Sequence, residues 1–141
     1  MILITVVDDD NGLTFNHRRQ SKDRMLRQHI LQMVEGKTLW MDSYSVRQFE
    51  ELSQDGAKVD DDYFAKAAPG DFCFMERMPD SFCEGRIEQL ILFRWNCRYP
   101  GDSHFEIVPK PPTWVLVLTE EFAGSSHEKI TKEVWNHAKE N

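Results

Sequence analysis

Residues 2–36 read ILITVVDDDNGLTFNHRRQSKDRMLRQHILQMVEG and contain, in order, the patterns of a strand, a loop and a helix. The run Ile2–Val7 is apolar and mostly β-branched, without alternation of polar residues, which is typical of a strand covered on both faces. Residues 8–12 read DDDNG and end the strand with side chains that favour turns. We therefore expect Ile2–Val7 to lie in the middle of a sheet.

A helix is expected after the loop, with Ser21 as its N-cap and Gly36 at its end. Its apolar stripe has the spacing of an amphipathic helix and consists of Leu26, Ile30, Met33 and Val34. The next apolar run, residues 38–41, completes a strand, helix and strand order. This order predicts a right-handed parallel crossover.

The rest of the chain contains further short elements. Apolar runs predict strands at 72–75, 89–95, 114–118 and 130–135, the last two as an antiparallel pair. Helices are expected at 44–52 and 63–68, with a loop at 53–61. Together these patterns predict an α/β fold in a single domain of residues 1–141. Its central sheet should be mixed and mostly parallel, with about six strands, flanking helices and a C-terminal antiparallel pair.

Composition limits the classes of function. The chain has 141 residues and a formal net charge of −7, and this acidic balance argues against a nucleic-acid partner or a membrane surface. The three cysteines show no Cys-x-x-Cys spacing, and the opening apolar run is too short for a signal peptide or a membrane span. These features predict a cytoplasmic protein with reduced thiols and no membrane association.

One segment is basic within this acidic chain. It contains Arg18, Arg19, Lys22 and Arg24 against the single carboxylate of Asp23. A basic loop that leads into a helix N-terminus, beyond the carboxyl end of a strand, suits a bound anion. A solvated surface loop is the alternative interpretation, and the sequence leaves both open.

Residues 8–49 resemble the first third of dihydrofolate reductase without a gap. The run Gly36-Lys37-Thr38-Leu39-Trp40-Met41 is similar to the Gly-Lys-Thr-Val-Ile-Met strand of that family, and Gly101-Asp102-Ser103-His104-Phe105 is similar to its Gly-Asp-Thr-x-Phe motif. The resemblance extends over most of the chain and implies a single dihydrofolate-reductase-like domain.

The chain departs from the family at its functional positions. Leu26 stands where the family has its catalytic carboxylate, and Asp23, one turn earlier, is the candidate replacement as proton donor. Residues 42–45 read DSYS in place of the phosphate-binding Gly-Arg-x-Thr, and Met75-Glu76 replaces paired glycines that approach the cofactor. These departures from the family argue against NADPH as the cofactor. The sequence indicates no other cofactor, which stays unknown.

The family also has two edge strands between the positions of Phe49 and Asp60, and the chain is shorter there. Their loss would leave residues 38–41 at the edge of the sheet. We expect that edge to be a surface that a second subunit of a homodimer would cover.

Three functions remain open at this point. The first is binding of a small anionic or nucleotide-like ligand without standard dihydrofolate reduction, through Arg18, Arg19, Ser21, Lys22, Arg24 and Ser103. The second is an active NADPH-dependent reductase of a pterin or related heterocycle, with Asp23 as the catalytic acid. The third is a metal-dependent hydrolase or nuclease that uses the basic loop and the acidic turns at Asp8-Asp9-Asp10 and Asp60-Asp61-Asp62, although the histidine spacing predicts no metal site.

Overall fold

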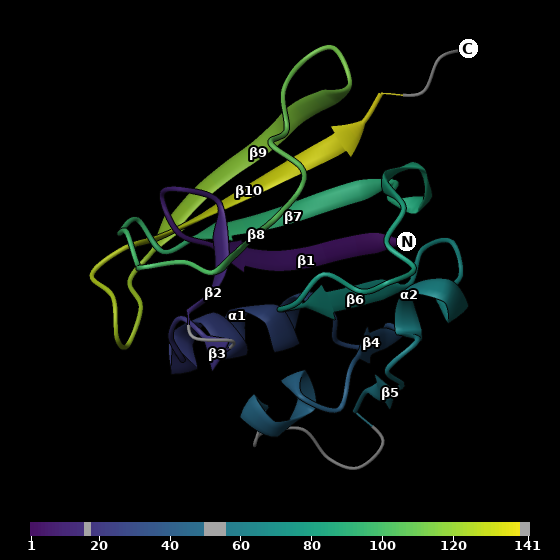
Figure 1. Ribbon diagram of the computed structural model, residues 1–141, viewed down its shortest axis with the longest axis horizontal. Helices are drawn as coiled ribbons and strands as arrows, with labels where there is room; N and C mark the ends of the chain where they lie inside the picture. Colours follow the sequence, from purple (N-terminus) through teal and green to yellow (C-terminus); the bar gives the residue numbers. More distant parts are fainter. Residues whose placement is uncertain (16–17, 50–55, 139–141) are drawn as a thin grey trace.

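The computed structural model describes residues 1–15, 18–49 and 56–138. In this part the main sheet has seven strands in the order β5-β4-β6-β1-β7-β10-β9 (Figure 1). Their bounds are β1 Ile2–Val7, β4 Leu39–Met41, β5 Lys58–Val59, β6 Phe72–Met75, β7 Gln89–Arg94, β9 Trp114–Phe122 and β10 Ile130–His137. A smaller antiparallel sheet consists of β2 Gly12–Phe15 between β3 Arg18–Arg19 and β8 Ser103–His104. The helices are α1 Arg24–Met33 and α2 Tyr63–Lys66, with 3₁₀ turns at Ser45–Gln48 and Glu84–Arg86.

The central position of β1 is confirmed. It pairs in parallel with β6 on one side and with β7 on the other, and β6 in turn pairs in parallel with β4. The C-terminal antiparallel pair is also confirmed, with β10 between β7 and β9. The sheet is therefore mixed and mostly parallel, as the sequence predicts.

The expected edge at β4 is wrong. Lys58 and Val59 form the short strand β5, which pairs in parallel with Trp40 and Met41, so the main sheet has one strand more than expected. Because β5 covers the outer side of β4, the argument for a homodimer contact at that edge no longer holds. The small β3-β2-β8 sheet was also not expected.

Two helix predictions need correction. The helix expected at 44–52 is a 3₁₀ turn, because Asp42 Oδ1 accepts a hydrogen bond from Ser45 N at 2.7 Å and starts a tight turn; residues 50–52 lie outside the described part. The N-cap of α1 is Asp23 instead of Ser21, since the Asp23 carboxylate accepts from Leu26 N at 3.0 Å. The helix ends at Met33, and the chain then turns through Gly36 with φ +75°.

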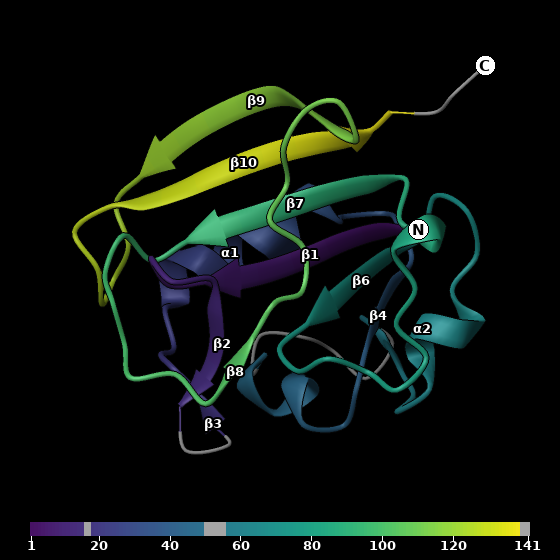
Figure 2. The same cartoon turned by 45° about the horizontal axis from the view of Figure 1, so that its top comes forward.

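The sheet is covered on both faces. Leu26 and Ile30 of α1 and Val34 at its C-cap are buried against one face, in a core that also contains Phe93 and Val134. The other core contains Phe64 of α2 and the connections that follow β6 and β8. In Figure 2, α1 lies behind the sheet and the segment after β8 crosses in front of β1 and β7. None of the helices in the described ranges has the length and apolarity of a membrane span.

The turn after β1 is built around a buried carboxylate. Asp8 is fully buried and accepts hydrogen bonds from Asp10 N, Gly12 N, Tyr99 N and Gln20 Nε2 at 2.7 to 3.1 Å. Burial alone would raise the pKa of Asp8, but these donors outweigh it and hold the pKa below its ordinary value. This ionised group ties the loop after β7 to the end of β1.

Candidate functional site

The carboxyl ends of β1 and β6 form the topological switch point of the sheet. The chain leaves β1 through α1 on one face, whereas Met78, Phe82 and Ile87 of the connection after β6 pack on the other face. Ligands of open α/β sheets bind beyond the carboxyl ends of the strands at such points. Two hollows lie in this region, and we call them the inner hollow and the outer crevice.

The inner hollow has a volume of about 20 Å³, which is room for roughly one water molecule. It is lined by Val6, Leu13, Ser21, Leu26, Gln48, Phe74, Met75, Glu76 and Trp95. Leu26 is 4% exposed and presents an apolar side chain where the resemblance implies the catalytic acid. The space is too small for a heterocyclic substrate.

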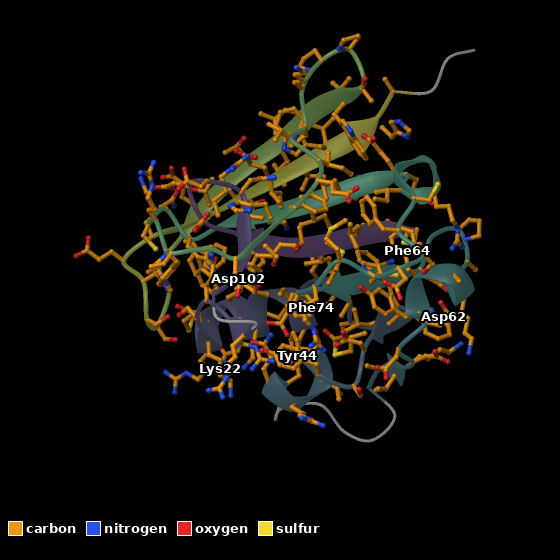
Figure 3. All side chains as sticks on the ribbon, viewed as in Figure 1. Lys22, Tyr44, Asp62, Phe64, Phe74 and Asp102 are labelled. Atoms are coloured by element: carbon orange, nitrogen blue, oxygen red, sulfur yellow. The ribbon has the colours of Figure 1, made fainter. Side chains whose placement is uncertain are left out.

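Two arginines and a tyrosine lie next to the inner hollow. The Arg19 guanidinium pairs with Glu76 through Nε at 2.8 Å and Nη2 at 3.1 Å, and Arg19 N donates to Tyr44 Oη at 2.9 Å. The guanidinium groups of Arg19 and Arg77 both lie over the Tyr44 ring, 4.4 and 4.0 Å from its centroid. Tyr44 projects from the turn after β4 (Figure 3). This packed cluster joins the ends of β3, β4 and β6.

The outer crevice has a volume of about 360 Å³. It is lined by Asp42, Ser43, Asp61, Tyr63, Arg77, Met78, Pro79 and Asp80. These residues come from the turn after β4, the start of α2 and the connection after β6. Three carboxylates face one guanidinium, so the lining is acidic.

Hydrogen bonds hold the carboxylates of the crevice in place. Ser43 donates to Asp61 Oδ1 through both its backbone N and its Oγ, each at 2.9 Å. These bonds lower the pKa of Asp61. Asp42 accepts from Ser45 N through Oδ1, and its Oδ2 lies 3.7 Å from Arg77 Nη2. Hydrogen bonds within and between these loops therefore fix the positions of the Asp42 and Asp61 carboxylates.

Tyr63 lines the same crevice and carries a buried polar atom. The residue is 2% exposed, and its hydroxyl has no hydrogen-bond partner among the described residues. Burial, followed by the negative charge of Asp42, raises the pKa of Tyr63 above its ordinary value. The hydroxyl therefore stays protonated and can donate. A buried hydroxyl without a partner costs about 1–3 kcal/mol, which a ligand with an acceptor atom would recover.

Asp23, the predicted catalytic acid, is held in a capping role. Its carboxylate accepts from Leu26 N, Ser125 N, Ser126 N and Ser126 Oγ at 2.8 to 3.0 Å. Burial alone would raise the pKa of Asp23, but these donors outweigh it and hold the pKa far below its ordinary value. An ionised carboxylate with these contacts is suited to capping α1 and poorly suited to giving up a proton.

Two of the predicted anion-binding residues lie on opposite sides of a strand. Thr14 of β2 pairs with Arg19 on one side and Ser103 on the other, so these two predicted residues are separated by a strand. Ser103 Oγ lies 2.6 Å from Thr14 Oγ1. Ser21 lines the inner hollow, and Arg24 N donates to Ser125 Oγ at 2.8 Å.

The remaining basic side chains of that segment lie on the surface. Arg18, Lys22 and Arg24 are exposed, and the Lys22 carbonyl accepts from Ser126 Oγ at 3.0 Å. Their proximity to the α1 N-terminus is as expected. However, the Asp23 carboxylate already supplies a negative charge at the N-terminus of α1.

Sequence reasoning missed Tyr63 and Arg77 as site residues. The run Asp60-Asp61-Asp62 was noticeable as an acidic turn, but it gave no indication that Tyr63 would be buried beside Asp42 and Arg77. Within residues 1–15, 18–49 and 56–138, no three His, Cys, Asp or Glu side chains are grouped to hold a metal ion.

No model of a protein family matches the sequence, and no curated protein matches it. The class that the fold defines is therefore an α/β protein with a mixed seven-stranded sheet and a small antiparallel sheet in its described part.

Proposed function

We propose that this chain is a divergent dihydrofolate-reductase-like domain that binds a small organic cation in the outer crevice and does not reduce dihydrofolate. The mixed, mostly parallel sheet with its antiparallel β10-β9 pair is consistent with this family. Residues 42–45 and 75–76, where the chain departs from the family, lie at the carboxyl ends of β4 and β6.

Loss of the standard reaction is supported by the inner hollow. Leu26 offers no proton, and a hollow of about 20 Å³ does not admit a pterin ring. Asp23 does not replace the acid, because its carboxylate is ionised and occupied by the α1 cap. The Arg19–Glu76 pair and Tyr44 take up the space that the resemblance gives to the cofactor, and these contacts argue against NADPH.

The chemistry of the outer crevice points to the ligand class. Asp42, Asp61 and Asp80 against Arg77 favour a ligand with net positive charge, whereas the sequence alone had suggested an anionic or nucleotide-like one. Arg77 and the Tyr63 hydroxyl are, in addition, donors that suit an acceptor such as a carboxylate. The volume of about 360 Å³ falls within the usual range of about 300–1,000 Å³ for small-molecule pockets. A basic amino acid or a similar molecule has both features.

The observation that carries this proposal is the buried Tyr63 hydroxyl without a partner among the described residues. L-arginine is a suitable probe, because agmatine lacks its carboxylate and 5-guanidinopentanoate lacks its α-amino group. Isothermal titration calorimetry should show saturable binding of L-arginine and weaker binding of both analogues. Asp61→Asn should weaken binding of L-arginine by about tenfold or more, as expected for loss of a charged partner.

Tyr63→Phe provides a second, more specific test. It removes an unsatisfied buried hydroxyl, so the free energy of unfolding should stay equal or rise while affinity for L-arginine falls. A Tyr63→Phe variant that is at least as stable as the parent but binds L-arginine more weakly would identify Tyr63 as a ligand contact. The proposal fails if L-arginine does not bind at millimolar concentration, or if Tyr63→Phe binds it as tightly as the parent.

A further inference from the structure

The two ends of the main sheet differ in how they are protected. At one end β5 has only two residues, one of which is Lys58, and short charged strands resist pairing with other chains. At the other end β9 has nine residues and pairs only with β10 in the described part of the chain (Figure 1). The outer backbone groups of β9 are therefore available for another strand.

The first half of β9 is apolar and exposed. Val115, Leu116, Val117 and Leu118 are 47%, 44%, 51% and 40% exposed. No charged residue interrupts the run from Trp114 to Thr119. A long apolar edge strand of this kind is a template for association, and a soluble protein normally protects it with charges or covers it.

Apolar side chains extend over both faces of this edge. Leu118 pairs with Val134 of β10, and Leu116 pairs with Trp135, so the two leucines lie on opposite faces of the sheet. The register shifts between these pairs, which places Val117 as an extra residue at the middle of the run. A partner strand beside β9 would cover the apolar side chains of both faces at once.

We propose that the partner is a second copy of this chain, with β9 of one subunit antiparallel to β9 of the other around a two-fold axis near Val117. The sheet then continues across both subunits, and the 115–118 run packs on itself. An isologous contact of this type is the commonest arrangement in homodimers.

Charge supports a second copy in the antiparallel sense. Glu120 and Glu121 lie at one end of β9, and the exposed Lys110 precedes the other end. Antiparallel pairing about Val117 sets Glu120 and Glu121 opposite Trp114 and Thr113 of the other subunit, at the end of β9 that Lys110 precedes, whereas parallel pairing would place glutamates beside glutamates. Prolines at 109, 111 and 112 limit the ladder to the strand itself, because they lack an N–H donor.

Sedimentation velocity of the full chain over a range of concentrations tests the proposal. The parent should be dimeric, and Val117→Lys should raise the dimer dissociation constant by more than about tenfold, because two lysines would meet at the axis. Val108→Lys is the matched control: Val108 is 67% exposed but lies outside β9, so this variant should dimerise like the parent.

Amide hydrogen exchange of the parent gives a second measurement that needs no variant. Amides of residues 115–121 should become more protected as protein concentration rises, while those of β5 should not change. A parent that is monomeric at every concentration overturns the proposal. A Val117→Lys dimer as tight as the parent's, or β9 exchange that is independent of concentration, also overturns it.

Discussion

At the scale of single residues, the buried carboxylates of Asp8 and Asp23 organise the loops around the site. Each is held ionised by N–H and O–H donors that are distant in sequence, such as Tyr99 for Asp8 and Ser126 for Asp23. Their pKa values are lowered in the folded state despite burial. The folded protein therefore binds fewer protons than the unfolded chain in acid.

Because of this difference in proton binding, the stability of the folded protein should depend on pH. The stabilisation is fully present above the unfolded pKa of about 3.9 and is lost as pH falls through the folded pKa values, so stability should decline below about pH 5. Asp23→Asn should lower the free energy of unfolding near neutral pH by about 2–4 kcal/mol, because the amide offers one acceptor oxygen to four donors. Urea denaturation at a series of pH values measures both effects, and the variant should show a flatter decline. An unchanged pH profile would contradict the assignment of Asp23 as an ionised cap.

The exposed part of the basic segment provides a separate residue-scale prediction. If exposed Arg18 and Arg24 attract an anion near α1, sulfate should raise the melting temperature, and replacing both by Ala should reduce that shift. Arg98→Ala is the control, because Arg98 is exposed and pairs with Asp10 elsewhere. Equal protection of the double variant and the parent would identify the segment as a solvated loop.

At the scale of elements, the loop between β9 and β10 fixes the start of α1. A Cβ atom at Gly124 would lie 2.5 Å from Asp23 Oδ2 and 2.8 Å from the His127 carbonyl oxygen, and both atoms are held by hydrogen bonds. Gly124→Ala should therefore lower the free energy of unfolding by about 1–3 kcal/mol through overpacking. Gly85→Ala is the control, since its Cβ would meet only Cys83 Sγ at 3.9 Å, and it should be neutral or slightly stabilising. Equal stability of the two variants would contradict a close contact between this loop and α1.

The sequence predicts helices and strands well where the hydrophobic pattern is strong. Ile2–Val7, the Leu26, Ile30 and Val34 stripe, and the 130–135 strand follow from burial patterns that local composition reveals. The strand β5 is different, because two exposed residues carry no hydrophobic pattern and depend on β4 for their pairing. The α1 cap also depends on distant residues: both Ser21 and Asp23 are good N-caps, and Ser125 and Ser126 select Asp23.

The candidate site was less accessible to sequence reasoning. The replacement of the family's acid by Leu26 is visible in the sequence, and the structure adds that this side chain helps to close the inner hollow. Tyr63 could not be found in this way, since a buried hydroxyl without a partner is a property of packing between α2 and the ends of β4 and β6. The acidic character of the outer crevice similarly arises from loops far apart in the chain.

At the scale of the whole molecule, we propose a dihydrofolate-reductase-like scaffold whose crevice is acidic where the resemblance implies a phosphate-binding site. The position that the resemblance gives to cofactor phosphates contains Asp42 and lies beside Asp61 and Asp80, and the packed cluster of Arg19, Glu76 and Tyr44 lies next to it. The charge of the chain, −7, adds a general repulsion of anions. A molecule built in this way should not retain the cofactor affinity of a reductase.

Titration with NADPH, followed by quenching of tryptophan fluorescence, tests this central claim most directly. Trp95 lines the inner hollow and would report a dinucleotide bound across the ends of β1 and β6. We expect no saturable quenching of tryptophan fluorescence up to millimolar NADPH, under conditions in which L-arginine binds. Saturable binding of NADPH at micromolar concentration would contradict it and would favour an active reductase.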